Sequence, residues 1–192
     1  MMLSDENIVA ALLDGQITIA PEPDLTAQLG SCSLDLRLGH EFRIFNAGKM
    51  TCIDPTDPQS GKETTDEITV KDGEGFILKP NDFVLAVTQE TVTLSNTLAA
   101  RLEGRSSLGR LGIVVHSTAS VVDPGWSGRI VLELGNLGKM PVALYPGMRI
   151  CALTFEELKT PSKIPYDKKI NAKYKNQSAP IASRIGDEAK TR

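Results

Sequence analysis

Residues 104–112 carry the side chains that are typical of a phosphate site. Their sequence is GRSSLGRLG, in which two arginines flank two serines and glycines punctuate the run. Glycine lets a backbone approach a ligand closely, and hydroxyl and amide groups hydrogen-bond phosphate oxygens. Arginine adds a guanidinium group that can donate two charge-assisted hydrogen bonds to a phosphate. A basic loop with turn glycines is the other interpretation, and the residues alone leave both open.

A carboxylate inside an apolar run is the second feature that could do chemistry. If residues 129–134, RIVLEL, form a strand, Glu133 and Val131 point to one face and the alternate apolar side chains to the other. Burying a carboxylate without a partner costs free energy. Glu133 therefore either faces solvent, as is usual on an antiparallel strand, or lines a pocket where it transfers protons.

His116 and Asp123 have ordinary structural interpretations. A single histidine is more often structural than catalytic, and Asp123 precedes Pro-Gly, which is typical of a turn. The only other histidine is His40, and no G-x-S-x-G motif is present. A Ser-His-Asp hydrolase is therefore not supported.

The elements that must position these groups are mostly strands. Ser4 predicts the start of a short helix over about residues 4–14, with acids in its first turn and Gly15 at its end. Alternating hydrophobicity predicts strands within residues 33–38, 41–45, 83–88 and 129–134. Turns are predicted at residues 79–82, 123–125 and 145–147, and a polar excursion with at most short strands at residues 46–75. Many short strands separated by turns indicate a sandwich or barrel.

The bulk composition limits the class of partner. The 192 residues suffice for one domain with a substantial core. Lys plus Arg total 21 and Asp plus Glu total 24, so the net charge of −3 argues against a nucleic-acid binder with a broad basic face. This net charge does not exclude a small anionic ligand, because a pocket needs only a few cationic side chains. We expect no membrane span and no secretory signal, and we interpret the three cysteines as reduced thiols of a cytoplasmic protein.

Six segments, in order, resemble the motifs of the dCTP deaminase family within the dUTPase superfamily. They are residues 33–39, 104–110, 123–128, 130–133, 145–148 and 172–177, and the resemblance extends from about residue 1 to 186. It implies a mainly β fold, a distorted β-barrel or jelly roll of the dUTPase-like (β-clip) type with a short N-terminal helix and few other helices. It implies a single domain over residues 1–192, in a homotrimer with active sites at subunit interfaces.

The resemblance also implies roles for individual residues. Glu133 is the general base and later proton donor, Ser106 holds the water together with the backbone carbonyl of Ala119, and Arg110 orients Glu133 and Ser106. The tail, from about residue 160 to 192, closes over the nucleotide. The substrate-binding residues are expected to be Arg105, Ser106, Ser107, Leu108, Gly109, Arg110, Asp123, Val131, Leu132, Glu133, Tyr166, Lys173 and Gln177.

The implied reaction converts dCTP to dUTP and ammonia, which supplies dUMP and dTTP synthesis. Zinc deaminases carry H-x-E and P-C-x-x-C ligand motifs. This sequence has neither H-x-E nor C-x-x-C, so we expect no zinc and a side chain that activates the water. The resemblance implies Mg²⁺ held by the triphosphate, not by protein ligands, and dTTP as a feedback inhibitor.

Two alternatives remain open. A bifunctional enzyme would release dUMP and pyrophosphate, and Gly109 and residues 116–119 resemble that group. Arg105, Trp126 and residues 172–185 resemble the monofunctional group, whereas Ser120 matches neither. A non-catalytic regulatory trimer that binds nucleotide is the third class, and the presence of Glu133, Ser106 and Arg110 together argues against it.

Overall fold

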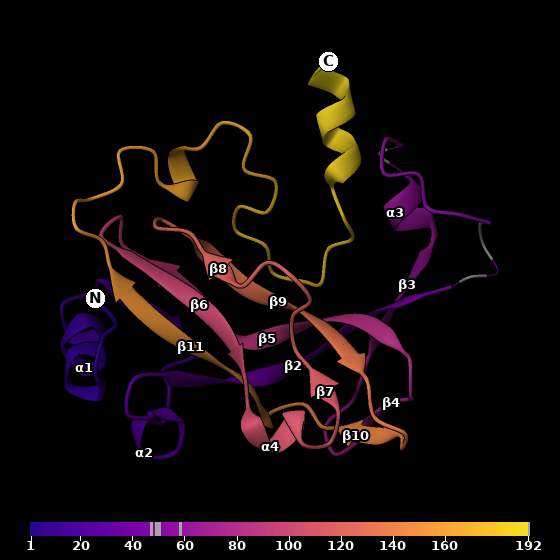
Figure 1. The fold of residues 1–192 in the computed structure, drawn as a ribbon, viewed down its shortest axis with the longest axis horizontal. Helices are drawn as coiled ribbons and strands as arrows, with labels where there is room; N and C mark the ends of the chain where they lie inside the picture. Colours follow the sequence, from indigo (N-terminus) through magenta and orange to yellow (C-terminus); the bar gives the residue numbers. More distant parts are fainter. Residues whose placement is uncertain (47, 49–50, 58, 192) are drawn as a thin grey trace.

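Strands account for most of the regular structure in the computed structural model, which describes residues 1–46, 48, 51–57 and 59–191 (Figure 1). The strands are β1 (Ile17–Ala20), β2 (Leu34–Phe45), β3 (Thr65–Thr69), β4 (Phe76–Leu78), β5 (Phe83–Leu94), β6 (Leu98–Gly104), β7 (Ile113–Val114), β8 (Val121–Val122), β9 (Ser127–Asn136), β10 (Val142–Leu144) and β11 (Arg149–Glu157). The helices are α1 (Asp5–Leu13), α2 (Leu25–Gln28), α3 (Ser60–Glu63), α4 (Ser106–Gly109) and the 3-10 helices η1 (Tyr166–Lys168) and η2 (Ile185–Thr191). The predicted mainly β class is confirmed.

The short helices match the predicted pattern. The Ser4 side chain accepts a hydrogen bond from the Asn7 backbone N–H and caps α1, whose buried Ile8 and Ala11 pack on the core. Within the described part of the excursion at residues 46–75 there are only α3 and the five-residue β3. Residues 47, 49–50 and 58 of that excursion, and residue 192 of the tail, lie outside the described residues. No described helix is long and apolar enough to cross a membrane.

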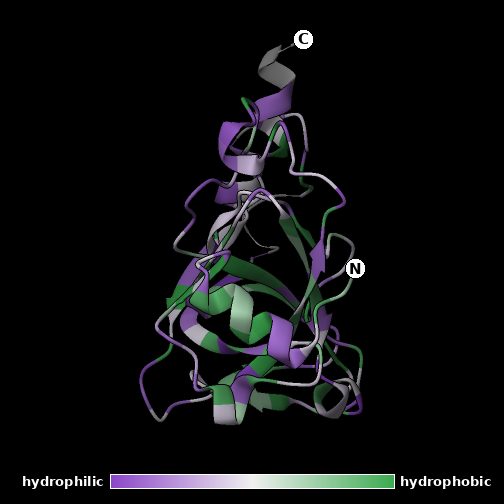
Figure 2. Ribbon diagram, turned by 90° about the vertical axis from the view of Figure 1, so that its left-hand side faces the viewer, coloured by the Kyte–Doolittle hydropathy of each residue, from purple (hydrophilic) through white to green (hydrophobic). Residues whose placement is uncertain are grey.

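The strands pair antiparallel in a nine-stranded sheet of order β7-β9-β5-β2-β11-β6-β8, with β1 added to β5 and β3 to β2, while β10 pairs with β4. The sheet curls around the core, whose fully buried side chains include Phe42, Phe155, Leu36, Leu132 and Leu134. In Figure 2 the strands carry most of the hydrophobic colour, and the C-terminal segment above them is largely hydrophilic. The curl brings β8 close to β9, since Val122 and Ile130 line one small cavity.

The predicted strands are present but two of them are continuous. Residues 34–38 and 41–45 belong to the single strand β2, whose pairing with β5 shifts register between Leu38 and Phe42. Such a bulge bends a strand without ending it, so the two predicted stretches form one strand. The turns at residues 79–82, 123–125 and 145–147 are confirmed, and backbone hydrogen bonds of 3.0–3.1 Å close all of them.

The tail lies across the outer edge of β9. Asn176 N–H donates to Ser127 O at 3.0 Å, and Arg129 N–H donates to Gln177 O at 2.9 Å. Gln177, Pro180 and Ala182 are buried. The polar C-terminal segment is thus packed on strands of its own chain.

Candidate active site

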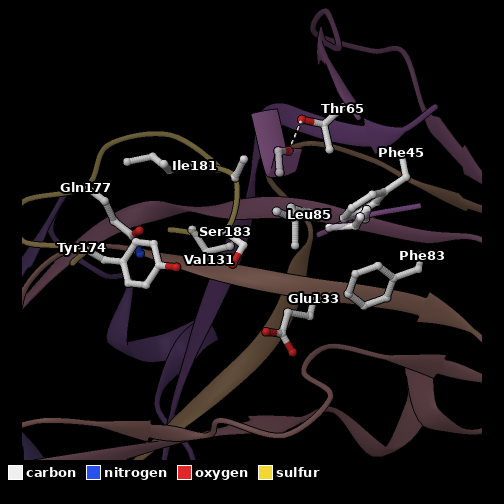
Figure 3. Close-up of a pocket in the computed structure, with 13 residues that line it drawn as sticks. Phe45, Thr65, Phe83, Leu85, Val131, Glu133, Tyr174, Gln177, Ile181 and Ser183 are labelled. Atoms are coloured by element: carbon white, nitrogen blue, oxygen red, sulfur yellow. Dashed lines mark hydrogen bonds between the residues drawn. The ribbon is translucent and has the colours of Figure 1, made fainter. Parts of the chain in front are cut away.

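A cavity of about 320 Å³ lies between β9, β5, the end of β2 and the tail. Glu133 is the carboxylate in its wall. Figure 3 shows Tyr174 and Gln177 on one side of Glu133 and the aromatic ring of Phe83 on the other. The lining residues are Phe45, Ile53, Gly61, Thr65, Phe83, Leu85, Val131, Glu133, Tyr174, Gln177, Ile181, Ala182 and Ser183. The lining is therefore mostly apolar with a few polar groups, which is the usual composition of a small-molecule site.

Backbone groups hold Glu133 in place. Its N–H donates to Val115 O at 3.0 Å, and its Oε2 accepts a hydrogen bond from Ser117 N–H at 2.8 Å. The strand alternation predicted from the sequence is confirmed, because Ile130, Leu132 and Leu134 are buried while Glu133 is half-buried at the cavity. The chain thus holds the Glu133 carboxylate in a fixed place at the wall of the cavity.

Five tail residues line this cavity: Tyr174, Gln177, Ile181, Ala182 and Ser183. Gln177 lines it, and its Nε2 donates to Arg129 O at 3.1 Å. Tyr174 lines it as well, and its N–H donates to the Tyr166 hydroxyl at 3.1 Å. Of the other predicted tail residues, Tyr166 packs on Trp126 with ring centroids 5.1 Å apart, and Lys173 pairs with Glu188. Neither Tyr166 nor Lys173 belongs to the cavity lining, and Tyr166 is linked to the lining only through the backbone N–H of Tyr174.

The predicted phosphate segment, residues 105–110, lies elsewhere on the chain. It forms α4 and its flanks at the end of β6, where Ser106, Ser107 and Arg110 are exposed and Leu108 is buried. Arg105 Nε is 3.1 Å from the Asp35 carboxylate, and its Nη1 donates to Arg149 O at 3.0 Å. None of residues 105–110 is among the lining residues of the Glu133 cavity. A single chain does not bring Ser106 and Arg110 to Glu133.

The remaining predicted residues surround the same region. Ala119 lines a second cavity of about 120 Å³, which shares Val131 and Gln177 with the first. The Asp123 carbonyl accepts a hydrogen bond from Trp126 N–H in the predicted turn. Leu132 is fully buried in the core, so its side chain faces away from both cavities. Any contact of Leu132 with a ligand would come through its backbone.

Several lining residues escaped prediction. Phe45 and Phe83 lie at the ends of predicted strands, but the sequence did not show which strands meet at Glu133. Tyr174 lies inside the motif at residues 172–177, between two residues that were singled out. Among the described residues, no group of three or more His, Cys, Asp or Glu side chains is placed to hold a metal ion.

Comparisons with known proteins place the chain in a family. The dCTP deaminase-like family model matches residues 2–158. The dCTP deaminase of Thermomicrobium roseum is 53% identical over 188 residues, which cover 98% of this chain and 95% of that protein. The "dCTP deaminase, dUMP-forming" of Dictyoglomus thermophilum is 49% identical over 185 residues, 96% of this chain and 95% of that protein.

A solved structure supports the predicted fold. The 2'-deoxycytidine 5'-triphosphate deaminase from Agrobacterium tumefaciens superposes with a TM-score of 0.64 at 22% identity, covering 82% of this chain and 48% of that chain. This likeness shows that the two chains share a fold. Because the family model spans most of the sequence and full-length relatives share about half of its residues, the chain belongs to the dCTP deaminase family.

Proposed function

We propose that this chain deaminates dCTP to dUTP and ammonia, with Glu133 as the general base. The observation that carries the proposal is the Glu133 carboxylate, held by the Ser117 N–H at 2.8 Å in the wall of a largely apolar cavity. Family membership supplies the substrate, and the cavity supplies a place where a base can act.

The chemistry follows from that carboxylate. Glu133 accepts a proton from a water molecule as the water oxygen bonds to carbon 4 of the cytosine ring. The same proton then passes to the exocyclic nitrogen, the carbon–nitrogen bond breaks and ammonia leaves, while the remaining hydroxyl proton moves to ring nitrogen 3 as the carbonyl of uracil forms. The apolar walls around Phe83 and Val131 suit a flat base and keep other water away.

We propose that a neighbouring subunit completes the site in a homotrimer. Ser106 and Arg110 are exposed on their own chain and line no cavity with Glu133. In a closed ring of identical subunits, one surface of each chain meets a different surface of the next. Residues 105–110 of one subunit would then meet the Glu133 cavity of another, with Ser106 holding the water and Arg110 orienting it.

The substrate would be the magnesium complex of dCTP. Arg105, Ser106 and Ser107 offer a guanidinium group and two hydroxyls to the triphosphate, and the tail with Lys173 and Gln177 would close over it. dTTP shares the deoxyribose and triphosphate, and we propose it as the feedback inhibitor. The three cysteines are unpaired, which supports a reducing cytoplasmic setting.

The second candidate is release of dUMP and pyrophosphate, which is favoured by the resemblance of residues 116–119 and by the dUMP-forming relative at 49% identity. Product analysis after incubation with dCTP and Mg²⁺ separates the alternatives. Equal amounts of dUTP and ammonia support the proposal, and dUMP with pyrophosphate supports the bifunctional alternative. Intact dCTP after prolonged incubation, with binding retained, would identify a regulatory nucleotide-binding protein.

A further inference from the structure

Arg129 joins three separate parts of the chain beside the Glu133 cavity. Its Nη1 and Nη2 donate to the Glu41 carboxylate on β2 at 2.8 and 2.9 Å. Its Nε donates to Thr88 O on β5 at 2.6 Å, and its Nη1 also donates to Ser178 O in the tail at 2.8 Å. The Arg129 side chain is only 15% exposed. A two-pronged pairing of this kind fixes the plane of the guanidinium group.

The backbone of Arg129 holds the same stretch of tail. Its N–H donates to Gln177 O at 2.9 Å, and its carbonyl accepts from Gln177 Nε2 at 3.1 Å. Gln177 and Tyr174 are the first tail residues after the 3-10 turn at Tyr166 that line the Glu133 cavity, and residues 181–183 line it further along the tail. Three hydrogen bonds that hold residues 177–178 of the tail therefore converge on Arg129, next to the bond from Asn176 N–H to Ser127 O.

Two glycines leave the space for this contact. A Cβ atom on Gly39 would lie 2.3 Å from Arg129 Nη2 and 2.8 Å from Val87 O. A Cβ atom on Gly128 would lie 3.0 Å from Gln177 O, and Gly128 has a φ of 148°. Side chains at these positions would displace the guanidinium group or the tail. The glycine at position 39 thus leaves room for the Arg129 guanidinium group, and the glycine at position 128 leaves room for the docked tail.

We propose that the Arg129–Glu41 ion pair is a positioning device that docks residues 176–178 on β9 and so sets Gln177 and Tyr174 at the cavity before nucleotide binds. The inference rests on the proposed function for its effect on catalysis, but docking itself is independent of any substrate. Arg129 and Glu41 do not line the cavity, so they act through the tail.

A docking equilibrium has a defined kinetic signature. If only the docked form binds dCTP productively, the apparent dissociation constant equals the intrinsic constant divided by the docked fraction. Saturating dCTP then restores the docked form. Weakening the ion pair should raise KM and leave kcat nearly unchanged, whereas partial unfolding would lower the concentration of active enzyme and hence kcat.

The test compares Glu41→Gln with Glu156→Gln in the full chain. Glu156 pairs with Arg101 at 2.8 Å across β11 and β6, and both glutamates are 38% exposed. The same chemical change is thus made in two cross-strand Arg–Glu pairs, of which one touches the tail contact. Arg129→Lys is the rescue variant, because it keeps the charge beside Glu41 while losing the fork that also reaches Ser178 O.

Two readouts are measured: steady-state kinetics with dCTP, and the rate of trypsin cleavage after Lys173, Lys175 or Arg184 without nucleotide. We expect Glu41→Gln to raise KM and tail cleavage about tenfold each, since a hydrogen-bonded ion pair is involved, with kcat within about twofold. Arg129→Lys should fall between Glu41→Gln and wild type, and Glu156→Gln should match wild type.

Unchanged cleavage and KM in Glu41→Gln, or equal changes in Glu156→Gln, would overturn the proposal. If the wild-type chain does not deaminate dCTP, the proposed function fails, and the cleavage rates alone still decide whether the pair docks the tail.

Discussion

At the scale of single residues, the proposed chemistry depends on one side chain held by one backbone amide. The Ser117 N–H that bonds to Glu133 belongs to the main chain, so no side-chain substitution at position 117 other than proline removes it. A glutamine at position 133 could accept the same hydrogen bond through its amide oxygen. The geometry of the cavity and the capacity for proton transfer are therefore separable by mutation.

Glu133→Gln should abolish turnover while dCTP still binds. General acid–base catalysis typically contributes a factor of about 10² to 10⁴, and glutamine cannot accept the proton from water. The measurements are kcat by steady-state assay and dCTP affinity by calorimetry. Near-normal turnover in this variant would remove Glu133 from the mechanism.

The Glu41–Arg129 pair should also make the stability of the folded chain depend on pH. The hydrogen bond from Arg129 lowers the pKa of Glu41 below its ordinary value in the folded chain. The unfolded chain therefore takes up this proton more readily. The stabilisation is fully present above the ordinary carboxyl pKa, about 4.3, and is lost as the pH falls through the lower folded pKa.

The measurement is the difference in Tm between the wild-type chain and Glu41→Gln. It should be largest near pH 7 and shrink below a pH of about 4, since the variant has no carboxyl at this position to protonate. All other carboxyl groups are common to both proteins and cancel in the difference. A difference that stays constant down to a pH of about 3 would contradict this assignment.

At the scale of elements, periodicity predicted where strands lie, and long-range contacts decided how they meet. Alternation located parts of β2, β5 and β9, and it placed Glu133 and Val131 on one face. The continuity of β2 depends on a bulge against β5, which no local pattern reports. The docking of the tail depends on Glu41 and Arg129, which lie 88 positions apart in the sequence. The motifs predicted Gln177, but its partners come from the fold.

Deleting residues 161–192 should affect both stability and binding. Tyr166 covers Trp126, and Ser178 accepts a hydrogen bond from Arg129, so the ligand-free protein should lose several degrees of Tm, at about 2–4 °C per kcal/mol lost. Gln177 and Tyr174 would be absent from the cavity wall. A ligand that binds the native state raises its stability. dCTP with Mg²⁺ should therefore stabilise the full chain, and it should stabilise the truncated chain far less.

Thermal melts of both proteins, with and without dCTP and Mg²⁺, measure this. Equal stabilisation by the nucleotide would show that the tail does not contribute to the binding site. An unchanged Tm in the absence of ligand would show that the packing of Tyr166 and Ser178 adds little to stability.

At the scale of the whole molecule, the sheet order explains why one chain holds only part of the proposed site. Glu133 lies on β9, and residues 105–110 follow β6. In the sheet, β5, β2 and β11 separate β9 from β6. The curl of the sheet returns β8 toward β9, but the turn after β6 stays outside the cavity lining. Glu133 and residues 105–110 thus occupy different surfaces of the chain, as a ring with active sites between subunits requires.

Mixed trimers test this arrangement directly. Glu133→Gln and Arg110→Ala should each be inactive alone. If a site takes Glu133 from one subunit and Arg110 from its neighbour, co-expression of the two variants at equal amounts should leave about a quarter of the sites with both native residues, and activity should reappear in proportion. A mixture of Glu133→Gln with Glu133→Ala cannot form such a site and is the control. If Glu133 and Arg110 act within one subunit, every subunit of the mixed trimers lacks one of the two, and no activity returns. Recovery in the first mixture alone would therefore establish that the base and its orienting arginine come from different chains.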